Sequence, residues 1–192
     1  KYFNLSKEYF LLGYPEIFLT QNTDKFYINN KKRILITLTD NMCFLYSRYP
    51  SMSLKINGNL CIPYLNNLIN NKIFNDIKWI IRMHPISTPE DIRLIRKNIN
   101  IIKNRNPKLD IVIDNQSSLM SLIRQSSLHI SLNSSVAMKC SLLNKNSIMT
   151  CPVYNKSDYF EDLRSNKLCF ILEENYTEEN FTELVKNLIT YN

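Results

Sequence analysis

Two short segments of this 192-residue chain carry side chains suited to holding a phosphate. The first, Arg82-Met83-His84-Pro85, ends an apolar run that begins at Ile77. Proline stops a strand and biases the preceding residue to an extended backbone, so we expect His84 at the strand's carboxyl end. An imidazole there can donate a hydrogen bond to a phosphate and stabilise a leaving group. Arg82, two residues earlier, shares its face of the strand. The alternative is a histidine that only completes a turn.

The second segment is Asn133-Ser134-Ser135, between the apolar run Leu128–Leu132 and an expected helix over residues 134–143. A helix N-terminus offers unpaired backbone N–H groups and the positive end of the helix dipole, which suits an anion. The serine hydroxyls add donors. The alternative is an ordinary helix cap, for which asparagine and serine are favoured.

The other polar residues suggest less chemistry. His129 alternates with apolar neighbours inside an expected strand, which favours a structural role. The segment Asp114-Asn115-Gln116 follows another strand and more readily closes a turn than contacts a sugar hydroxyl. We find no spacing that indicates a Ser/His/Asp or Cys/His nucleophile. The chain has only two glycines, which excludes glycine-rich phosphate loops.

Short apolar runs alternate with amphipathic segments along the chain, and this alternation indicates how the two segments are positioned. Strands are expected at residues 33–38, 77–82, 109–113, 128–132, 147–151 and 169–172. Alternating strands and helices form right-handed βαβ units. We therefore predict an α/β fold, a doubly wound, Rossmann-like parallel sheet of about six strands in the order 3-2-1-4-5-6. Such sheets bind ligands beyond the carboxyl ends of their strands.

The helices are marked by caps and apolar spacing. Residues Cys61, Leu65, Leu68, Ile69, Lys72 and Ile73 recur at helical intervals. Pro89 with the acids after it opens another helix. Thr177 can cap the last helix, whose first turn holds Glu178 and Glu179. We expect one domain over residues 31–192, whereas residues 1–30 are irregular and are expected to be a linker or the tail of a missing N-terminal domain.

The composition restricts the partners and the compartment. The net charge of +7 can attract nucleic acid, an anionic membrane or a phosphorylated small molecule. The basic residues are scattered, so we expect no nucleic-acid partner. The five cysteines lack zinc spacing and are expected to be free, packed thiols in a reducing compartment. We find no signal peptide and no apolar run long enough to span a membrane, which favours a cytoplasmic protein.

The order of these motifs resembles the C-terminal, donor-nucleotide domain of GT-B glycosyltransferases of bacterial surface polysaccharide synthesis. The similar enzymes are sialyltransferases, polysialyltransferases, capsule Kdo transferases and CDP-glycerol glycerophosphotransferases. His84-Pro85 matches their HP motif and Ser134-Ser135 their serine motif. Gly13-Tyr14-Pro15 is similar to the segment that joins their two domains. The resemblance covers residues 9–150 and implies half of a GT-B architecture.

The resemblance implies a nucleotide-binding role for Arg82, His84, Pro85, Ser134 and Ser135, and also for Asn133 and Lys139, with His84 acting on the leaving phosphate. It implies a nucleotide-sugar donor, a glycan acceptor held by a missing N-terminal domain or a partner chain, and no obligatory metal cofactor. It also allows peripheral association with the inner membrane surface.

Two positions depart from the family pattern. Lys139 stands where a ribose-binding glutamate is expected, and Asn144-Lys145-Asn146 replaces a glycine before the next strand. The alternatives are therefore a non-catalytic nucleotide- or glycan-binding subunit and a domain similar to sugar-nucleotide epimerases. We expect the isolated chain to lack transferase activity, because the acceptor site and the catalytic base belong to the other domain.

Overall fold

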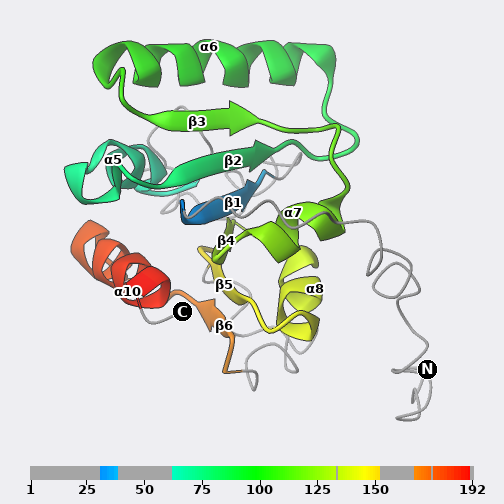
Figure 1. Ribbon diagram of the computed structural model, residues 1–192, viewed down its shortest axis with the longest axis vertical. Coiled ribbons are helices and arrows are strands. Elements are labelled where there is room, and N and C mark those ends of the chain that lie inside the picture. The colour runs from blue at the N-terminus through cyan, green and yellow to red at the C-terminus, as the bar shows by residue number, and fades with distance from the viewer. Residues whose placement is uncertain (1–30, 39–61, 133, 152–166, 174, 191–192) are drawn as a thin grey trace.

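The protein contains a six-stranded, entirely parallel sheet in the order β3-β2-β1-β4-β5-β6 (Figure 1). The structure is a computed structural model that describes residues 31–38, 62–132, 134–151, 167–173 and 175–190. The strands are β1 (Arg33–Thr37), β2 (Lys78–Arg82), β3 (Asp110–Ile113), β4 (Leu128–Ser131), β5 (Asn146–Met149) and β6 (Cys169–Ile171). This arrangement confirms the predicted doubly wound, Rossmann-like sheet and its strand order.

Helices cover both faces of the sheet. They are α5 (Leu65–Asn70), the 3-10 helix η1 (Lys72–Phe74), α6 (Pro89–Arg105), α7 (Leu119–Gln125), α8 (Val136–Leu142) and α10 (Glu178–Thr190). The buried side chains of α5, α6 and α10 share one core cluster. Those of α7 and α8 pack on the opposite face. No helix in the described parts of the chain is long and apolar enough to cross a bilayer.

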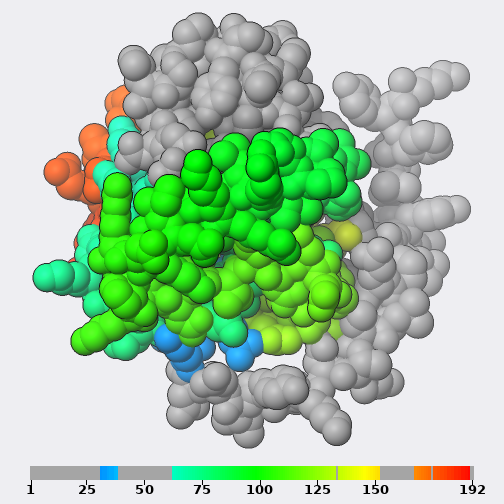
Figure 2. All heavy atoms as spheres, turned by 90° about the horizontal axis from the view of Figure 1, so that it is seen from above, coloured from blue at the N-terminus to red at the C-terminus, as the bar shows by residue number. Residues whose placement is uncertain are grey.

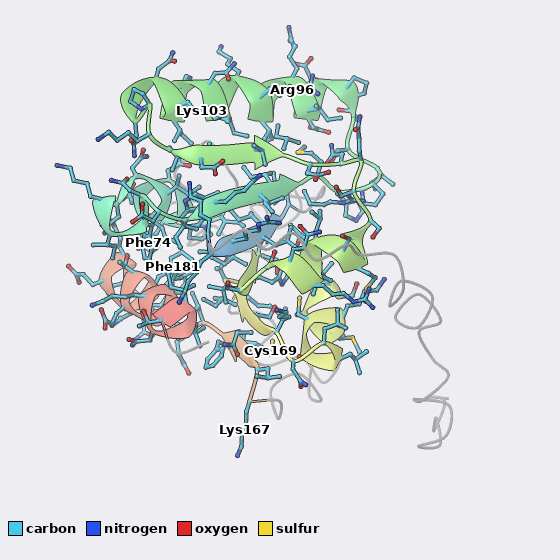
Figure 3. All side chains as sticks on the ribbon, in the orientation of Figure 1. Phe74, Arg96, Lys103, Lys167, Cys169 and Phe181 are labelled. Carbon is cyan, nitrogen blue, oxygen red and sulfur yellow. The ribbon has the colours of Figure 1, made fainter. Side chains whose placement is uncertain are left out.

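The larger core lies under α5, α6 and α10. Phe74 and Phe181 reach into it from η1 and α10 (Figure 3), and both are essentially inaccessible to solvent. The Phe74 ring packs edge-on against the Trp79 ring, with centroids 6.0 Å apart. On the other face, Leu35 and Ile80 pack against Ile123 of α7. The central strands are buried on both faces, which explains their continuous apolar sequence.

The amphipathic pattern of residues 61–73 does not form one helix. The backbone of Asn71 is extended, with ψ 124°, and it separates α5 from η1. The Asn71 side chain accepts a hydrogen bond from the Ile73 N–H at 3.2 Å, so it caps the second element. Ile73 is consequently 57% exposed and lies outside the core that the spacing had predicted for it. Cys61 lies outside the described residues.

The end of α8 explains one departure from the family pattern. Asn144 adopts a left-handed backbone with φ 53° just after the helix. Asparagine tolerates this conformation better than most residues, and it commonly replaces glycine after a helix. Asn144 therefore makes the turn into β5 for which a glycine had been expected.

The cap and cysteine predictions are confirmed where the structure describes them. The hydroxyl of Thr177 accepts a hydrogen bond from the Asn180 N–H at 3.2 Å at the start of α10. Cys140, Cys151 and Cys169 are buried, and within the described segments they form no disulfide. Cys43 and the residues 1–30, with their Gly13-Tyr14-Pro15 segment, lie outside the description, so the domain division at residue 31 stays a prediction.

Candidate functional site

The loop after β2 places His84 at the carboxyl edge of the sheet. Arg82 ends β2, and its carbonyl accepts a hydrogen bond from the Leu38 N–H at 2.9 Å. The chain then turns at His84, whose carbonyl accepts from the Ser87 N–H at 3.0 Å and whose Nδ1 accepts from the Ile86 N–H at 3.4 Å. The neutral tautomer that accepts at Nδ1 carries its proton on Nε2. The half-exposed His84 thus completes a turn.

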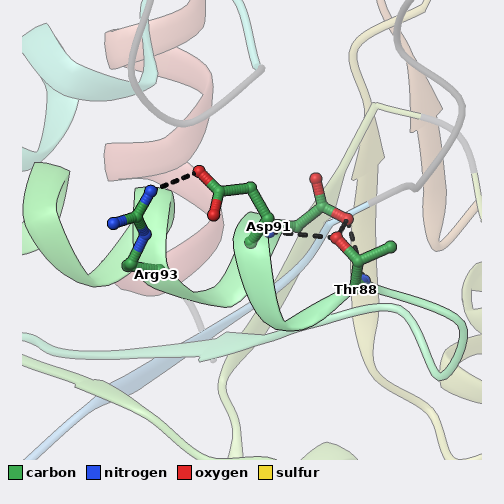
Figure 4. A network of polar contacts seen from close by, with 4 residues as sticks. Thr88, Asp91 and Arg93 are labelled. Atoms are coloured by element: carbon green, nitrogen blue, oxygen red, sulfur yellow. Dashed lines mark hydrogen bonds and ion pairs between the residues drawn. The ribbon is translucent and has the colours of Figure 1, made fainter.

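A capping box determines where this loop ends (Figure 4). The Thr88 hydroxyl accepts from the Asp91 N–H at 3.2 Å, and the Asp91 carboxylate accepts from the Thr88 N–H at 2.8 Å. The hydrogen bonds from the Thr88 hydroxyl and N–H lower the pKa of Asp91. Pro89 occupies the first turn of α6 and suits it, because an N–H there has no partner in the helix. The predicted helix start is therefore confirmed.

The loop between β3 and α7 braces the end of β2. Asn115 Oδ1 accepts a hydrogen bond from the Met83 N–H at 3.0 Å. The Arg82 guanidinium donates through Nη1 to the carbonyls of Ser117 and, at 3.4 Å, of Asp114. These contacts hold Arg82 beside the β3–α7 loop. Sequence reasoning had not singled out Asn115 for this role, although a polar residue directly after a strand is the signal that marks it.

Asp114 closes the turn that its sequence predicted. Its carboxylate accepts from the Gln116 N–H at 3.1 Å, from the Ser117 N–H at 2.9 Å and from the Ser117 hydroxyl at 2.6 Å. Partial burial would raise the pKa of Asp114, but these hydrogen bonds and the nearby charge of Arg82 outweigh it and lower the pKa. The Asp114 carboxylate therefore stabilises its own loop by accepting these hydrogen bonds, which confirms the turn interpretation.

The segment after β4 holds the two serines at the start of α8. The Ser134 hydroxyl accepts from the Val136 N–H at 3.2 Å, and its carbonyl accepts from the Ala137 N–H at 3.1 Å. Ser135 is exposed, stands at the N-cap position and makes no capping hydrogen bond with its side chain. Lys139 is half-buried one turn into the helix. Asn133, which the resemblance added to this segment, lies outside the described residues.

The sheet brings the two candidate segments to one edge. β1 lies between β2 and β4, and Thr37 at its end is in register with both Arg82 and Ser131. Neighbouring strands are about 4.8 Å apart, so the ends of β2 and β4 are separated by about 10 Å. The strand order reverses at this point, because β2 and β4 lie on opposite sides of β1. A nucleotide diphosphate, or a phosphate with its ribose, can span such a gap.

A pocket of about 560 Å³ lies elsewhere, beside β6 and the start of α10. Phe170, Glu173, Asn175 and Asn180 contribute to its lining, and none of the predicted site residues that the structure describes does. The strand ends and the pocket therefore indicate two different positions for a ligand site. We follow the strand ends, because ligands on doubly wound sheets bind where the strand order reverses.

The second histidine is part of the core. His129 is buried between two hydroxyls, with Nε2 2.8 Å from the Thr37 Oγ1 and Nδ1 2.7 Å from the Ser147 Oγ. Burial lowers the pKa of His129 to about 3. The imidazole is therefore neutral near pH 7 and cannot serve as a general acid there. The structural interpretation of His129 is confirmed, and its partners Thr37 and Ser147 become visible only when the strands are paired.

Comparison with known proteins establishes the fold. No family model and no curated protein matches the sequence. A solved structure of UDP-GlcNAc 2-epimerase from Neisseria meningitidis, bound to UDP-GlcNAc, is similar with a TM-score of 0.55 at 14% identity, over 94% of this chain and 43% of that one. The spinosyn rhamnosyltransferase in complex with spinosyn aglycone is similar with a TM-score of 0.51 at 14% identity, over 84% of this chain and 38% of that one.

The glycotransferase of kitacinnamycin is similar with a TM-score of 0.51 at 8% identity, over 88% of this chain and 38% of that one. These neighbours are GT-B glycosyltransferases and a UDP-GlcNAc 2-epimerase, and the chain spans less than half of each. The chain is thus an α/β domain of the Rossmann-like kind found in GT-B proteins. At such low identity the similarity shows the fold alone.

Proposed function

We propose that this chain is the donor-nucleotide-binding half of a glycosyltransferase, which transfers a sugar from a CMP-, CDP- or UDP-linked donor to a surface glycan such as a capsule or a lipooligosaccharide. One observation carries the proposal: the strand ends that bear His84-Pro85 and Ser134-Ser135 flank the end of β1, where the strand order reverses. This is the position at which doubly wound sheets bind ligands.

The proposed roles follow from the donors at this edge. His84 would donate from Nε2 to the leaving phosphate, and the Ser134 and Ser135 hydroxyls would donate to the same phosphate group. Arg82 uses Nη1 for loop carbonyls, but a guanidinium has other N–H groups that could add positive charge near the phosphate. Pro85 would fix the turn, while Asn133 and Lys139 would contact the rest of the nucleotide.

In the proposed reaction, an acceptor hydroxyl oxygen forms a bond to the anomeric carbon of the sugar. The bond from that carbon to the phosphate oxygen breaks, and the nucleotide departs with the electron pair. Hydrogen bonds from His84 and the two serines stabilise the charge that develops on the phosphate oxygens. The base that takes the acceptor proton is assigned to no residue of this chain.

The HP and SS motifs are similar to those of sialyltransferases, polysialyltransferases, capsule Kdo transferases and CDP-glycerol glycerophosphotransferases, and we propose that the enzyme belongs among the members of this group that transfer a sugar. The proposal includes a cytoplasmic location, a reaction without an obligatory metal, and an acceptor site on another domain or a partner chain. The chain alone would bind the donor nucleotide without transferring the sugar.

A second candidate is a sugar-nucleotide epimerase domain. The structure of the Neisseria meningitidis epimerase is similar over most of this chain and holds UDP-GlcNAc. The two candidates differ in their reaction, because an epimerase inverts a centre of the sugar and needs no acceptor. Conversion of UDP-GlcNAc to a second nucleotide sugar, detected by chromatography without any acceptor present, would favour the epimerase.

The proposal is tested first by the melting temperature of the chain with CMP, CDP, UDP or GDP. A ligand that binds only the folded state raises the melting temperature. Calorimetry then compares the variants His84→Ala and Ser134→Ala/Ser135→Ala with the original chain. Each should weaken nucleotide binding by about 1–3 kcal/mol, because each removes charge-assisted hydrogen bonds to the phosphate.

The control is Lys186→Ala, which also removes an exposed polar side chain, but on α10, away from the proposed phosphate position. It should leave the nucleotide affinity unchanged. If the chain binds a nucleotide and both site variants bind it as tightly as the original while remaining folded, His84 is only a turn residue and the two serines only begin a helix. A chain that binds none of the four nucleotides contradicts the proposed function itself.

A further inference from the structure

The pocket of about 560 Å³ beside β6 lies apart from the proposed phosphate position. β6 is the outermost strand on its side of the sheet, two strands beyond β4. Neighbouring strands are about 4.8 Å apart, so about 10 Å separates β6 from β4. Figure 2 looks down on the opposite end of the molecule, where the side chains of α6 lie over the sheet. The proposed nucleotide site therefore does not account for this pocket.

The polar part of the pocket lining offers hydrogen-bonding groups without positive charge. Glu173 and Asn175 lie in the turn between β6 and α10 and are exposed, and neither side chain has a hydrogen-bond partner among the described residues. The Asn180 Oδ1 accepts from the Thr177 hydroxyl at 3.0 Å and from the Thr177 N–H at 3.4 Å. This orients the Asn180 amide and leaves its N–H groups to donate elsewhere. The described lining residues include no Lys, Arg or His.

Aromatic residues form a fixed wall of the pocket. Phe170 and Tyr176 belong to the lining. The Tyr176 ring packs edge-on against the rings of Tyr64 and Phe181, with centroids 5.6 Å and 6.1 Å away. Tyr64 has a left-handed backbone with φ 59°, which is unfavourable for a bulky side chain and persists only where the surrounding structure imposes it. Because the wall is fixed before a ligand arrives, less ordering is needed on binding.

We propose that this pocket binds a neutral saccharide. A pyranose presents a face of C–H groups, which packs on aromatic and aliphatic side chains, and a rim of hydroxyls that both donate and accept. The Glu173 carboxylate would accept from hydroxyls, and the amides of Asn175 and Asn180 would donate to them. A phosphate or an acidic sugar is the weaker fit, because the described lining holds a carboxylate and no cation.

The size and position of the pocket agree with this assignment. Small-molecule sites occupy about 300–1,000 Å³, a range that includes this pocket. A mono- or disaccharide therefore fits it. The family resemblance assigns the glycan to another domain, whereas this pocket belongs to the chain itself. The inference does not depend on nucleotide binding.

The test is saturation-transfer NMR of the 192-residue chain with the methyl glycosides of glucose, galactose, mannose and N-acetylglucosamine, and with N-acetylneuraminic acid as the acidic probe. We expect a neutral glycoside to bind and the acidic sugar not to bind. Glu173→Ala/Asn175→Ala should raise the dissociation constant about 30-fold, the loss expected for two hydrogen bonds. Glu173→Gln, which keeps the shape of the side chain, should weaken binding less. Excess UDP should not displace the glycoside, because the two positions are separate.

The matched control is Glu183→Ala/Asn187→Ala, which removes the same residue types from exposed positions of α10 outside the pocket lining. Both double variants raise the net charge from +7 to +8, and circular dichroism should show both folded. The control should bind the glycoside as the original chain does. An equal loss in the two double variants would overturn the assignment to this pocket, as would displacement of the glycoside by UDP. Failure of every neutral glycoside to bind, or a preference for the acidic sugar, would overturn the proposed ligand.

Discussion

The buried histidine predicts how the stability of the domain depends on pH. His129 lies in the central strand β4, and its two ring nitrogens contact hydroxyls from β1 and β5. Both hydroxyls can accept a hydrogen bond, so they do not forbid a charged imidazolium. Its cost comes from burial, which removes the charge from water and lowers the pKa of His129 to about 3.

The sign of the effect follows from proton binding. Between about pH 6.5 and about pH 3 the unfolded chain holds a proton on this histidine and the folded chain does not. The free energy of unfolding therefore falls as the pH falls through this window. At pH 4.5 the loss from His129 is about 2–3 kcal/mol relative to pH 7.5, because each pH unit below the unfolded pKa costs about 1.4 kcal/mol.

The measurement is urea unfolding from pH 7.5 to pH 4.5, with His129→Gln and the original chain compared at each pH. The variant should be less stable at pH 7.5, but its stability should depend on pH less steeply, with a difference in slope that amounts to about 2–3 kcal/mol across the range. Equal slopes in His129→Gln and the original chain would refute the reasoning, because carboxylate titration is common to both.

Two further predictions concern the packing and the helix caps. Phe181→Ala should lower the free energy of unfolding by about 3–5 kcal/mol, because the ring is fully buried against Tyr176. Urea unfolding measures this loss, with Lys186→Ala, at an exposed position, as the control. A loss below about 1 kcal/mol would contradict the packing. Thr88→Ala should cost about 1 kcal/mol by breaking the capping box. Ser135→Ala, at an N-cap position without a side-chain bond, should cost less stability than Thr88→Ala, and equal losses in thermal unfolding would contradict the difference.

The strands were predictable because they are buried on both faces. A parallel strand covered by helices on either side is apolar throughout, and such runs stand out in a single sequence. The start of α6 was also predictable, since Pro89 and the acids after it act through local contacts. The break at Asn71 was missed, because a side-chain hydrogen bond to the Ile73 N–H competes with helix continuation without changing the apolar spacing.

The candidate site was predictable in its residues but not in its surroundings. Proline after His84 and serines before a helix are local signals, so the sequence alone identified both segments and their place at strand ends. The bracing of Arg82 by the carbonyls of Asp114 and Ser117, and of the Met83 N–H by Asn115, depends on β3 lying beside β2. Contacts between residues about thirty positions apart are set by strand pairing, which local sequence does not encode.

The sequence by itself determined the alternation of strands and helices, the positive charge and the chemical types at two strand ends, because these depend on composition and local spacing. Only the tertiary structure decided that His129 is a neutral core residue and that the loop after β3 braces the end of β2. The physical reason is the same for both. The pKa of a buried group and the partners of a side chain at a strand end depend on which distant segments pack around them, and folding determines that arrangement.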